Sequence, residues 1–252
     1  MKPYYEEAGI VIYCGDCREI LPQLGPVDLV LTDPPYGIGE ARGKNKSRTK
    51  LAVSKDYGVS SWDDRTPADW IFGLLREMSR YQIIFGGNYF PLPPSSCWLV
   101  WDKLNGNTDF ADCELAWTNL PKAVRRLQWR WQGMLQQDMS RKESHDHPTQ
   151  KPLAVMKWAL SQAPDDCGLI LDPFMGSGTT LVAAKEFGRR TIGIEREARY
   201  CDVAISRLRQ NVLDLDESTP HRSDDWLRAL GAQDAIKEEC REMLAKREAE
   251  RA

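Results

Sequence analysis

Several features are scarce in this chain, and each scarcity excludes a class of protein. No apolar stretch reaches the ~18–20 residues that a membrane-spanning helix needs, and no secretory signal opens the sequence. The formal net charge of −3 provides no global attraction to nucleic acid, so any such binding must come from local basic segments. We therefore expect a cytoplasmic protein with no membrane partner.

Patterns that ligate metals or form disulfides are also scarce. The seven cysteines are scattered, mostly in apolar segments, which indicates a reducing compartment rather than a disulfide framework. Cys14 and Cys17 form a lone Cys-x-x-Cys pair, whereas a structural zinc ion needs four ligands. His145 and His147 do not complete such a set. The sequence therefore predicts no metal site.

The chain does have enough apolar residues for a full core. At 252 residues and 42% hydrophobic, it is expected to form one domain with insertions. Short apolar runs rich in β-branched residues predict strands at Ile10–Cys14, Val27–Thr32, Ile83–Phe85, Trp98–Trp101, Glu114–Trp117, Leu169–Leu171 and Thr191–Ile194. Helical segments separate many of them. This alternation predicts a doubly wound, mostly parallel sheet, in which ligands bind beyond the carboxyl ends of the strands.

The helices are predicted from start signals and apolar spacing. A short helix is expected at Cys17–Leu24, and a capping box with proline at the first helical position predicts another from Thr66–Asp69 onward. The apolar residues of that second helix are expected to be Trp70, Leu74, Met78 and Tyr81. Further helices are predicted from Pro152, over Gly178–Phe187 and over Ala198–Val212.

The segment Asp172–Thr180 has the pattern of a nucleoside-binding turn. An acid ends a predicted strand, a Gly-x-Gly turn follows, and a helix begins. Glycines let the backbone approach a ligand closely, and a helix N-terminus presents N–H groups to an anion. Glu195 ends the next predicted strand, where an acid can accept hydrogen bonds from ribose hydroxyls. An ordinary strand-to-helix turn is the alternative interpretation of this pattern.

The tetrapeptide Asp33-Pro34-Pro35-Tyr36 ends an earlier apolar run. Asp33 offers a carboxylate and Pro34 a backbone carbonyl, while the two prolines fix φ and stiffen the turn. Tyr36 adds an aromatic face. A proline-rich turn with a capping aspartate is the alternative here.

Together, these two segments resemble the catalytic and cofactor motifs of the S-adenosylmethionine-dependent amino-methyltransferases that act on DNA. Their order, with the catalytic motif first, is similar to that of the circularly permuted group called β. The hexapeptide His147–Pro152 resembles the motif that precedes the cofactor motif in that group. The resemblance covers about Ile10 to Val212. It implies a circularly permuted, Rossmann-like α/β methyltransferase sheet with inserted DNA-recognition segments.

The resemblance implies that S-adenosyl-L-methionine is the cofactor and assigns residues to it. They are Asp16, Cys17, Asp33, Thr149, Gln150, Lys151, Asp172, Pro173, Phe174, Gly176, Ser177, Gly178, Thr179, Glu195 and Arg196. Within this set, Asp172 and the glycine turn are expected beside the methionine part, and Glu195 beside the ribose. Asp16 either accepts from the adenine amino group of the cofactor or simply caps the helix that follows.

The resemblance likewise implies that Asp33, Pro34, Pro35 and Tyr36 are catalytic. An exocyclic amine of a nucleobase is a poor nucleophile because its lone pair is delocalised into the ring, so methylation needs acceptors that hold its N–H groups. The target base must also leave the duplex. In this family Asp at the first position goes mostly with adenine N6, and Ser with cytosine N4. We therefore expect a site-specific DNA adenine-N6 methyltransferase.

Three alternatives stay open at this point. The acceptor is cytosine N4 in the first, and RNA or a protein amide in the second. In the third, the chain is a DNA-binding relative that has lost catalysis. The intact Asp33, Tyr36 and Glu195 argue against the third.

Two basic insertions and a tail lie outside the sheet pattern. In the catalytic domain, residues 1–212, the loop 37–61 is expected to clamp DNA phosphates, and the segment 118–147 to recognise the target sequence. Residues 213–252 are expected to form a charged helical extension. The predicted DNA contacts are Arg42, Lys44, Lys46, Arg48, Lys50, Arg125, Arg126, Trp129, Arg130 and Trp131. Double-stranded DNA is the expected partner, with a homodimer and a separate restriction endonuclease as further candidates.

Overall fold

A computed structural model describes residues 1–38, 65–106, 111–132, 135–139, 142–143, 147 and 149–213. Its strands are β1 (Tyr5–Glu7), β2 (Ile10–Cys14), β3 (Val27–Thr32), β4 (Ser79–Phe85), β5 (Trp98–Asp102), β6 (Cys113–Thr118), β7 (Arg125–Gln128), β8 (Trp131–Gln132), β9 (Leu135–Gln136), β10 (Leu169–Asp172) and β11 (Arg190–Glu195). The helices are α1 (Cys17–Ile20), α2 (Asp69–Met78), α3 (Leu153–Gln162), α4 (Thr179–Glu186) and α5 (Ala198–Leu213). Within these described residues, no helix is long and apolar enough to cross a membrane.

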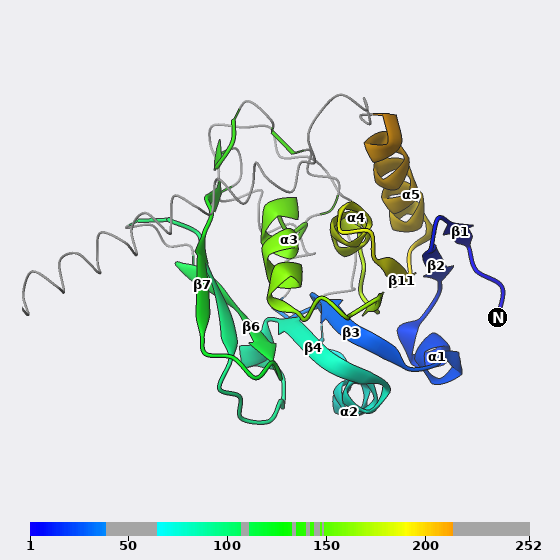
Figure 1. Cartoon of the computed structure of the whole chain (residues 1–252), viewed down its shortest axis with the longest axis horizontal. Coiled ribbons are helices and arrows are strands. Elements are labelled where there is room, and N and C mark those ends of the chain that lie inside the picture. Colours follow the sequence, from blue (N-terminus) through cyan, green and yellow to red (C-terminus); the bar gives the residue numbers. More distant parts are fainter. Residues whose placement is uncertain are drawn as a thin grey trace, which may run out of the picture. The chain divides into compact units, whose positions relative to one another are not determined.

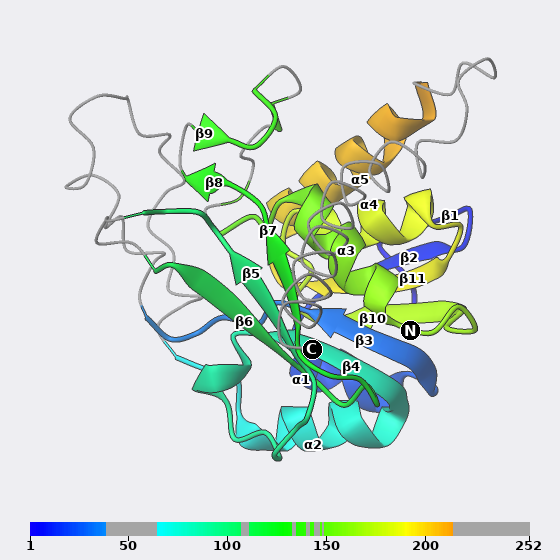
Figure 2. The same cartoon turned by 60° about the vertical axis from the view of Figure 1, so that its left-hand side comes forward.

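The main sheet is mixed but mostly parallel, as predicted. Among the described residues it has nine strands in the order β1-β2-β11-β10-β3-β4-β6-β5-β7 (Figure 1). The central strands β2, β11, β10, β3 and β4 run parallel to one another. Strand β6 runs antiparallel to both β4 and β5, and β1 runs antiparallel to β2. The short ladder β8–β9 forms a separate sheet, which Figure 2 shows apart from the main one.

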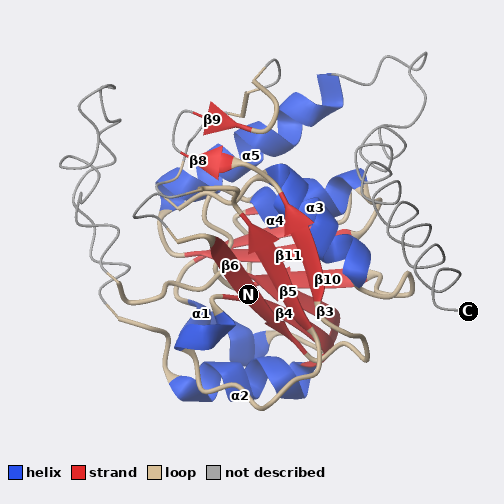
Figure 3. Ribbon diagram, turned by 90° about the vertical axis from the view of Figure 1, so that its left-hand side faces the viewer, coloured by secondary structure: helices blue, strands red, loops and turns tan. Residues whose placement is uncertain are grey.

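Helices cover both faces of the sheet, which explains why its central strands are apolar on both sides. Figure 3 shows α3, α4 and α5 on one face, and α1 and α2 on the other. On the second face, Leu75 of α2 belongs to one buried cluster with Val30 of β3. On the first face, Leu181 of α4 and Leu208 of α5 share a cluster with Ile12 of β2. Each face therefore has its own buried core.

The parallel strands bring the predicted site residues to one edge. Because β2, β11, β10, β3 and β4 point the same way, their carboxyl ends lie together. Asp172 and Glu195 are the last residues of β10 and β11, and Asp33 directly follows β3. Asp16 lies just after β2, and Gly86 directly follows β4. Segments far apart in the sequence thus meet at a single edge.

The predicted start of α2 was wrong, and its predicted apolar residues were right only in part. The helix begins at Asp69, after the N-cap Ala68, and no side chain caps it. Leu74 and Met78 pack against the core as predicted, although the fully buried residues are Ile71, Phe72 and Leu75. Trp70 is instead 50% exposed. The chain passes directly from Met78 into β4, so Tyr81, expected on the helix, lies in a strand. The packing of the buried residues of α2, and not the capping box, therefore determines where the helix begins.

The prediction that segment 118–147 stays outside the sheet was also wrong in part. Arg125–Gln128 forms β7, which pairs in parallel with β5 as an edge strand. Trp129 follows the end of β7, and Trp131 begins β8. The two exposed arginines of β7 obscured its strand pattern, since an edge strand needs only one buried position here, Leu127.

Candidate active site

A cavity of about 680 Å³ opens where the parallel strands end. It is lined by all of the predicted cofactor residues except Gly178, and by Pro35 of the predicted catalytic turn. The wall also includes residues that were not predicted. Among these are His147 and Tyr200 on one side, and Arg65 to Ala68 before α2 on another. One open cavity is therefore lined by residues of both sequence motifs.

Asp172 connects the end of β10 to the end of β3. Its Oδ1 accepts a hydrogen bond from the Thr32 hydroxyl at 2.6 Å and another from the Phe174 N–H at 3.1 Å. Burial raises the pKa of Asp172 to about 6, although these hydrogen bonds oppose the rise. The Thr32–Asp172 hydrogen bond thus joins the strand end that carries the cofactor motif to the strand end that carries the catalytic motif.

The turn after Asp172 requires glycine for steric reasons. Gly176 and Gly178 have φ values of 50° and 76°, in the left-handed region that favours glycine. A Cβ atom on Gly178 would lie 2.7 Å from the Cβ of Ala204 in α5. Gly178 is therefore a packing residue and the N-cap of α4, which explains why it does not line the cavity.

Glu195 stabilises this turn from the neighbouring strand. Its Oε2 accepts from the Gly176 N–H at 3.1 Å, and its Oε1 accepts from the Glu197 N–H at 2.8 Å. Burial raises the pKa of Glu195 above its usual value, and the two backbone hydrogen bonds partly oppose this. Each carboxylate oxygen has further acceptor capacity, so the side chain can hold the turn and still accept from a ligand hydroxyl.

Asp16 acts as the N-cap of α1. Its Oδ1 accepts from the Arg18 N–H at 2.9 Å, and its Oδ2 lies 2.5 Å from the Arg18 guanidinium. The Arg18 side-chain hydrogen bonds lower the pKa of Asp16, despite partial burial. The capping alternative from the sequence is therefore present, on a residue that also lines the cavity.

Arg207 of α5 donates hydrogen bonds to the glycine turn at Ser177 and Thr179. It was not predicted as a site residue. Its Nη1 donates to the Ser177 carbonyl at 2.8 Å, the Ser177 Oγ at 2.9 Å and the Thr179 Oγ1 at 3.0 Å. The Ser177 hydroxyl donates in turn to Gln150 Oε1 at 3.1 Å. Helix α5, the turn and the segment before α3 therefore form one polar network.

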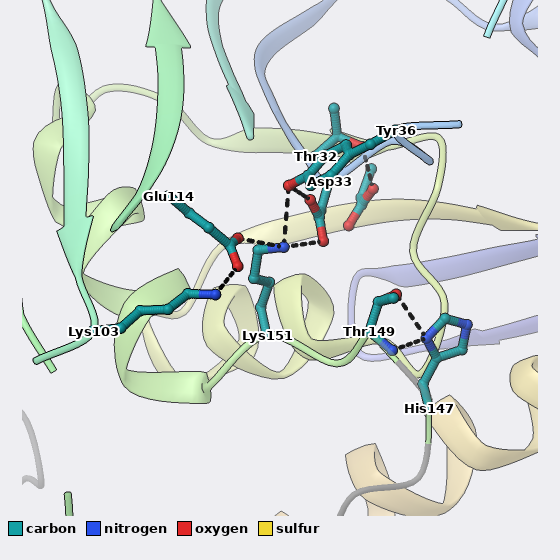
Figure 4. Close-up of polar contacts among 9 residues, drawn as sticks. Thr32, Asp33, Tyr36, Lys103, Glu114, His147, Thr149 and Lys151 are labelled. Atoms are coloured by element: carbon teal, nitrogen blue, oxygen red, sulfur yellow. Dashed lines mark hydrogen bonds and ion pairs between the residues drawn. The ribbon is translucent and has the colours of Figure 1, made fainter. Parts of the chain in front are cut away.

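Asp33 and Tyr36 contact each other across the catalytic turn. The Tyr36 hydroxyl donates to Asp33 Oδ1 at 2.5 Å, and Lys151 Nζ donates to Asp33 Oδ2 at 2.5 Å (Figure 4). Burial raises the pKa of Asp33, while the charge of Lys151 opposes the rise. Burial also raises the pKa of Tyr36 well above its usual value, so this hydroxyl keeps its proton.

Tyr36 is fixed by aromatic packing as well. Its ring stacks on Tyr89 with a centroid distance of 4.9 Å and an interplanar angle of 13°. The edge of the ring lies against Gly86, where an added Cβ would be 2.0 Å from Tyr36 Cε1. Gly86 also has φ at 65°. The segment after β4 therefore builds the wall against which Tyr36 rests.

Lys151 joins Asp33 to a second carboxylate that was not predicted as a site residue. Its Nζ lies 3.0 Å from Glu114 Oε2, and Lys103 contacts the other oxygen of Glu114 (Figure 4). Burial opposes the charge on Glu114, but Lys151 and Lys103 outweigh it and lower the pKa to about 2. Lys151 was expected at the cofactor; it also contacts the catalytic turn. The available signal for Glu114 was an acid inside an apolar strand.

His147 is a buried neutral residue of the cavity wall. Its Nδ1 lies 3.3 Å from the Thr149 nitrogen and 3.2 Å from the Thr149 hydroxyl, and its ring packs edge-on against Tyr200 at 4.4 Å. Burial lowers its pKa to about 3, so it carries no charge at neutral pH. Among the described residues, no cluster of three or more His, Cys, Asp or Glu side chains could hold a metal ion.

The predicted DNA contacts lie away from this cavity or outside the described residues. Arg42, Lys44, Lys46, Arg48 and Lys50 belong to the latter group. Of the others, Arg125, Arg126 and Arg130 are exposed, whereas Trp129 and Trp131 are partly buried. None of these five lines the cavity.

The chain is similar in sequence to known DNA methyltransferases and in fold to a solved one. Residues 97–206 match the N6/N4 family described as DNA methylase. The type II methyltransferase M2.LlaDCHI of Lactococcus lactis subsp. cremoris is 27% identical over 251 residues, covering 82% of this chain and 92% of that protein. M.ScaI of Streptomyces caespitosus is 28% identical over 254 residues, covering 82% and 84%. The PvuII DNA methyltransferase, a cytosine-N4-specific enzyme, has a similar fold, with a TM-score of 0.52 at 19% identity over 91% of this chain and 95% of that one.

Proposed function

Because this chain belongs to the N6/N4 DNA methylase family, we propose that it methylates adenine at N6 within a short recognition sequence. It is a DNA methyltransferase of the kind that modifies adenine N6 or cytosine N4. One observation carries the proposal: Asp33 lies partly buried at the carboxyl end of β3, held by Tyr36 and Lys151, in the cavity that also contains Asp172 and Glu195.

The cavity suits the cofactor, S-adenosyl-L-methionine. Its volume, about 680 Å³, lies within the ~300–1,000 Å³ range of small-molecule sites. Two carboxylates at strand ends, Asp172 and Glu195, flank a glycine turn that allows close approach of a ligand to the backbone. We assign the ribose to Glu195 and the methionine part to Asp172 and Gly176. When bound, the cofactor supplies an electrophilic methyl group.

The residues of the catalytic turn have separate tasks in this proposal. Asp33 and the Pro34 carbonyl accept hydrogen bonds from the amino group of the flipped base, which favours a pyramidal nitrogen with an available lone pair. Both oxygens of Asp33 already accept one hydrogen bond, but a carboxylate has about four acceptor sites, so room for the substrate remains. Tyr36 provides a ring for the base, held in place by Tyr89.

Adenine is preferred to cytosine because Asp33 begins the catalytic turn, as in most adenine-N6 members of the resembled family. Cytosine N4 is the second candidate, and PvuII, whose fold this chain shares, is cytosine-N4-specific. RNA or a protein amide is a more distant alternative acceptor. A non-catalytic DNA-binding relative would have no chemical need for the buried Asp33–Lys151 contact.

Sequencing with modified-base detection tests the proposal directly. DNA from cells that express this chain would be compared with DNA from cells that express Asp33→Ala. We expect N6-methyladenine in one short motif, absent from the Asp33→Ala sample. N4-methylcytosine would replace the adenine assignment, and no new mark in either sample would overturn DNA methylation itself.

Glu195→Ala is expected to weaken cofactor binding without unfolding the protein. A hydrogen bond to a charged group contributes about 1.5–3 kcal/mol, which corresponds to a loss of about 10- to 100-fold in affinity. Isothermal titration with S-adenosylmethionine measures the dissociation constant. An unchanged constant would contradict the ribose assignment.

DNA binding is assigned to the two basic segments, 37–61 and 118–147. Neutralising Lys44, Lys46 and Arg48 together is expected to flatten the salt dependence of DNA affinity by about 2 to 3 units in slope, since each phosphate contact contributes about 0.9. Fluorescence anisotropy over a salt series measures this slope. An identical slope would show that these cations do not contact phosphate.

The substrate, the candidate partners and the domain bounds are also proposed here. We propose double-stranded DNA as the substrate, with a homodimer and a separate restriction endonuclease as candidate partners. Residues 1–212 would form the catalytic domain and 213–252 an appended charged segment, most of which lies outside the described residues.

A further inference from the structure

Four charged side chains form an alternating chain that leads from the catalytic turn to the side of the sheet. Asp33 contacts Lys151 at 2.5 Å, Lys151 contacts Glu114 at 3.0 Å, and Glu114 contacts Lys103 (Figure 4). The formal charges alternate and sum to zero. The Lys151 side chain is only 9% exposed. The other three side chains are partly buried, and withdrawing charges from water is costly unless they are paired with good geometry.

Glu114 reaches the site from an antiparallel strand. It lies on β6, which runs antiparallel between β4 and β5 and so reaches the site from the opposite direction to the parallel strands. Lys151 lies in the segment just before α3, and Asp33 lies just after β3. Three separate parts of the chain thus converge on one ammonium group.

We propose that Glu114 is a positioning residue for methyl transfer, which shares Lys151 with Asp33 so that Lys151 orients the acceptor carboxylate without neutralising it. The inference rests on the proposed function of Asp33. Lys151 alone would form a tight pair with Asp33 and compete with the amino group of the base for its oxygens. With Glu114 on its other side, the ammonium divides its charge between two carboxylates, and Asp33 remains a strong acceptor.

The arrangement predicts opposite effects of the two partners on the ionisation of Asp33. The negative charge of Glu114 raises the pKa of Asp33, and the positive charge of Lys151 lowers it. Tyr36 donates to Asp33 and accepts from Lys151 Nζ at 3.2 Å, while Asp172 and His147 interact electrostatically with Asp33 and Lys151 respectively. These three are unchanged in the variants below, so a difference between variants reports on the ionic chain.

The test is the pH profile of kcat for DNA methylation, measured for the wild type and for Glu114→Gln. Asp33 must be ionised to accept, so its pKa sets an acid limb. Removing the Glu114 charge is expected to lower the pKa of Asp33, which moves this limb to lower pH, by about 1 unit. We expect kcat at the plateau to fall by about 10- to 100-fold, because Lys151 would then pair with Asp33 alone and compete with the amino group of the base for its oxygens. KM for DNA and for the cofactor should change little.

Three further variants test whether Glu114 acts through its negative charge or only by supporting the local structure. Glu114→Asp keeps the charge and should return the acid limb toward its wild-type position. Lys103→Met removes a positive charge at the outer end of the chain and should move the limb to higher pH, the opposite of Glu114→Gln. This variant also keeps the inference testable if Glu114→Gln does not fold. Glu186→Gln is the matched control, because Glu186 forms a comparable ion pair with Lys157 at 2.6 Å outside the site.

The outcomes distinguish the inference from the proposed function. If the wild type methylates DNA but Glu114→Gln has the kcat and acid limb of Glu186→Gln, the positioning role is wrong. If Lys103→Met and Glu114→Gln shift the limb in the same direction, the charge-sharing explanation is wrong. If the wild type methylates no DNA, the proposed function fails and the inference fails with it.

Discussion

Asp33→Asn should lower kcat for DNA methylation by about 10²–10⁴-fold while leaving cofactor binding close to wild type. The amide keeps the size of the side chain but removes the negative charge that accepts from the amino group of the base. It also exchanges one acceptor oxygen for an NH₂ group, which points a donor toward Tyr36 or Lys151, both of which donate to Asp33 in the native protein. Single-turnover kinetics with excess enzyme isolates the methyl-transfer step.

Cofactor titration provides the control for this variant. The glycine turn is held by Glu195, whereas the Asp33 carboxylate is held by Tyr36 and Lys151. The dissociation constant for S-adenosylmethionine should therefore change by less than about 5-fold, or about 1 kcal/mol. Retained methylation at the wild-type rate would remove Asp33 from the catalytic role. A loss of cofactor binding as large as the loss of kcat would make Asp33 a cofactor residue instead.

Gly86→Ala should both destabilise the protein and disable the site. An added Cβ would lie 2.0 Å from Tyr36 Cε1, and the φ of 65° is unfavourable for any residue with a Cβ. We expect a cost of about 2–4 kcal/mol, from left-handed backbone strain and forced repacking together. The ring must also move, which displaces the hydroxyl that donates to Asp33. Thermal denaturation should show a lower Tm, by about 2–4 °C for each kcal/mol.

Gly73→Ala is the matched control for that substitution. Gly73 lies inside α2, and a Cβ there would meet nothing within 4 Å. Alanine is favoured over glycine in a helix by about 1 kcal/mol, so this variant should be as stable as the wild type or more so. Equal melting temperatures for Gly86→Ala and Gly73→Ala would contradict the proposed packing of Tyr36.

The parts of the site that sequence reasoning located are those with a local signature. Asp33 and Asp172 each follow an apolar run and precede a turn rich in proline or glycine, so both were assigned to strand ends. Glu114 and Arg207 act only through pairing and packing between segments that are distant in sequence. No local pattern reveals that β6 is inserted antiparallel beside β4, or that α5 crosses beneath the glycine turn.

The start of α2 and the strand β7 were predicted wrongly because contacts between distant segments decide them. The capping box at Thr66 was a valid local signal, but the burial of Ile71, Phe72 and Leu75 decides which residues of α2 face the sheet. Strand β7 was missed because an edge strand is paired on one side only, and its exposed arginines hide the alternation that identifies other strands. Both errors came from tertiary context overriding local preference.

The hydrogen bond between Thr32 and Asp172 has a consequence for how such a protein can be encoded. It joins residues 140 positions apart, because β3 and β10 are neighbours in the sheet although they are distant in the gene. The site requires that β3 and β10 lie side by side in the sheet, whichever of them comes first in the chain. A rearranged gene that joined the old termini and opened a new start between the two motifs could encode the same site. The site therefore requires that the two motifs lie side by side in the sheet, and it does not require a particular order of the motifs in the chain.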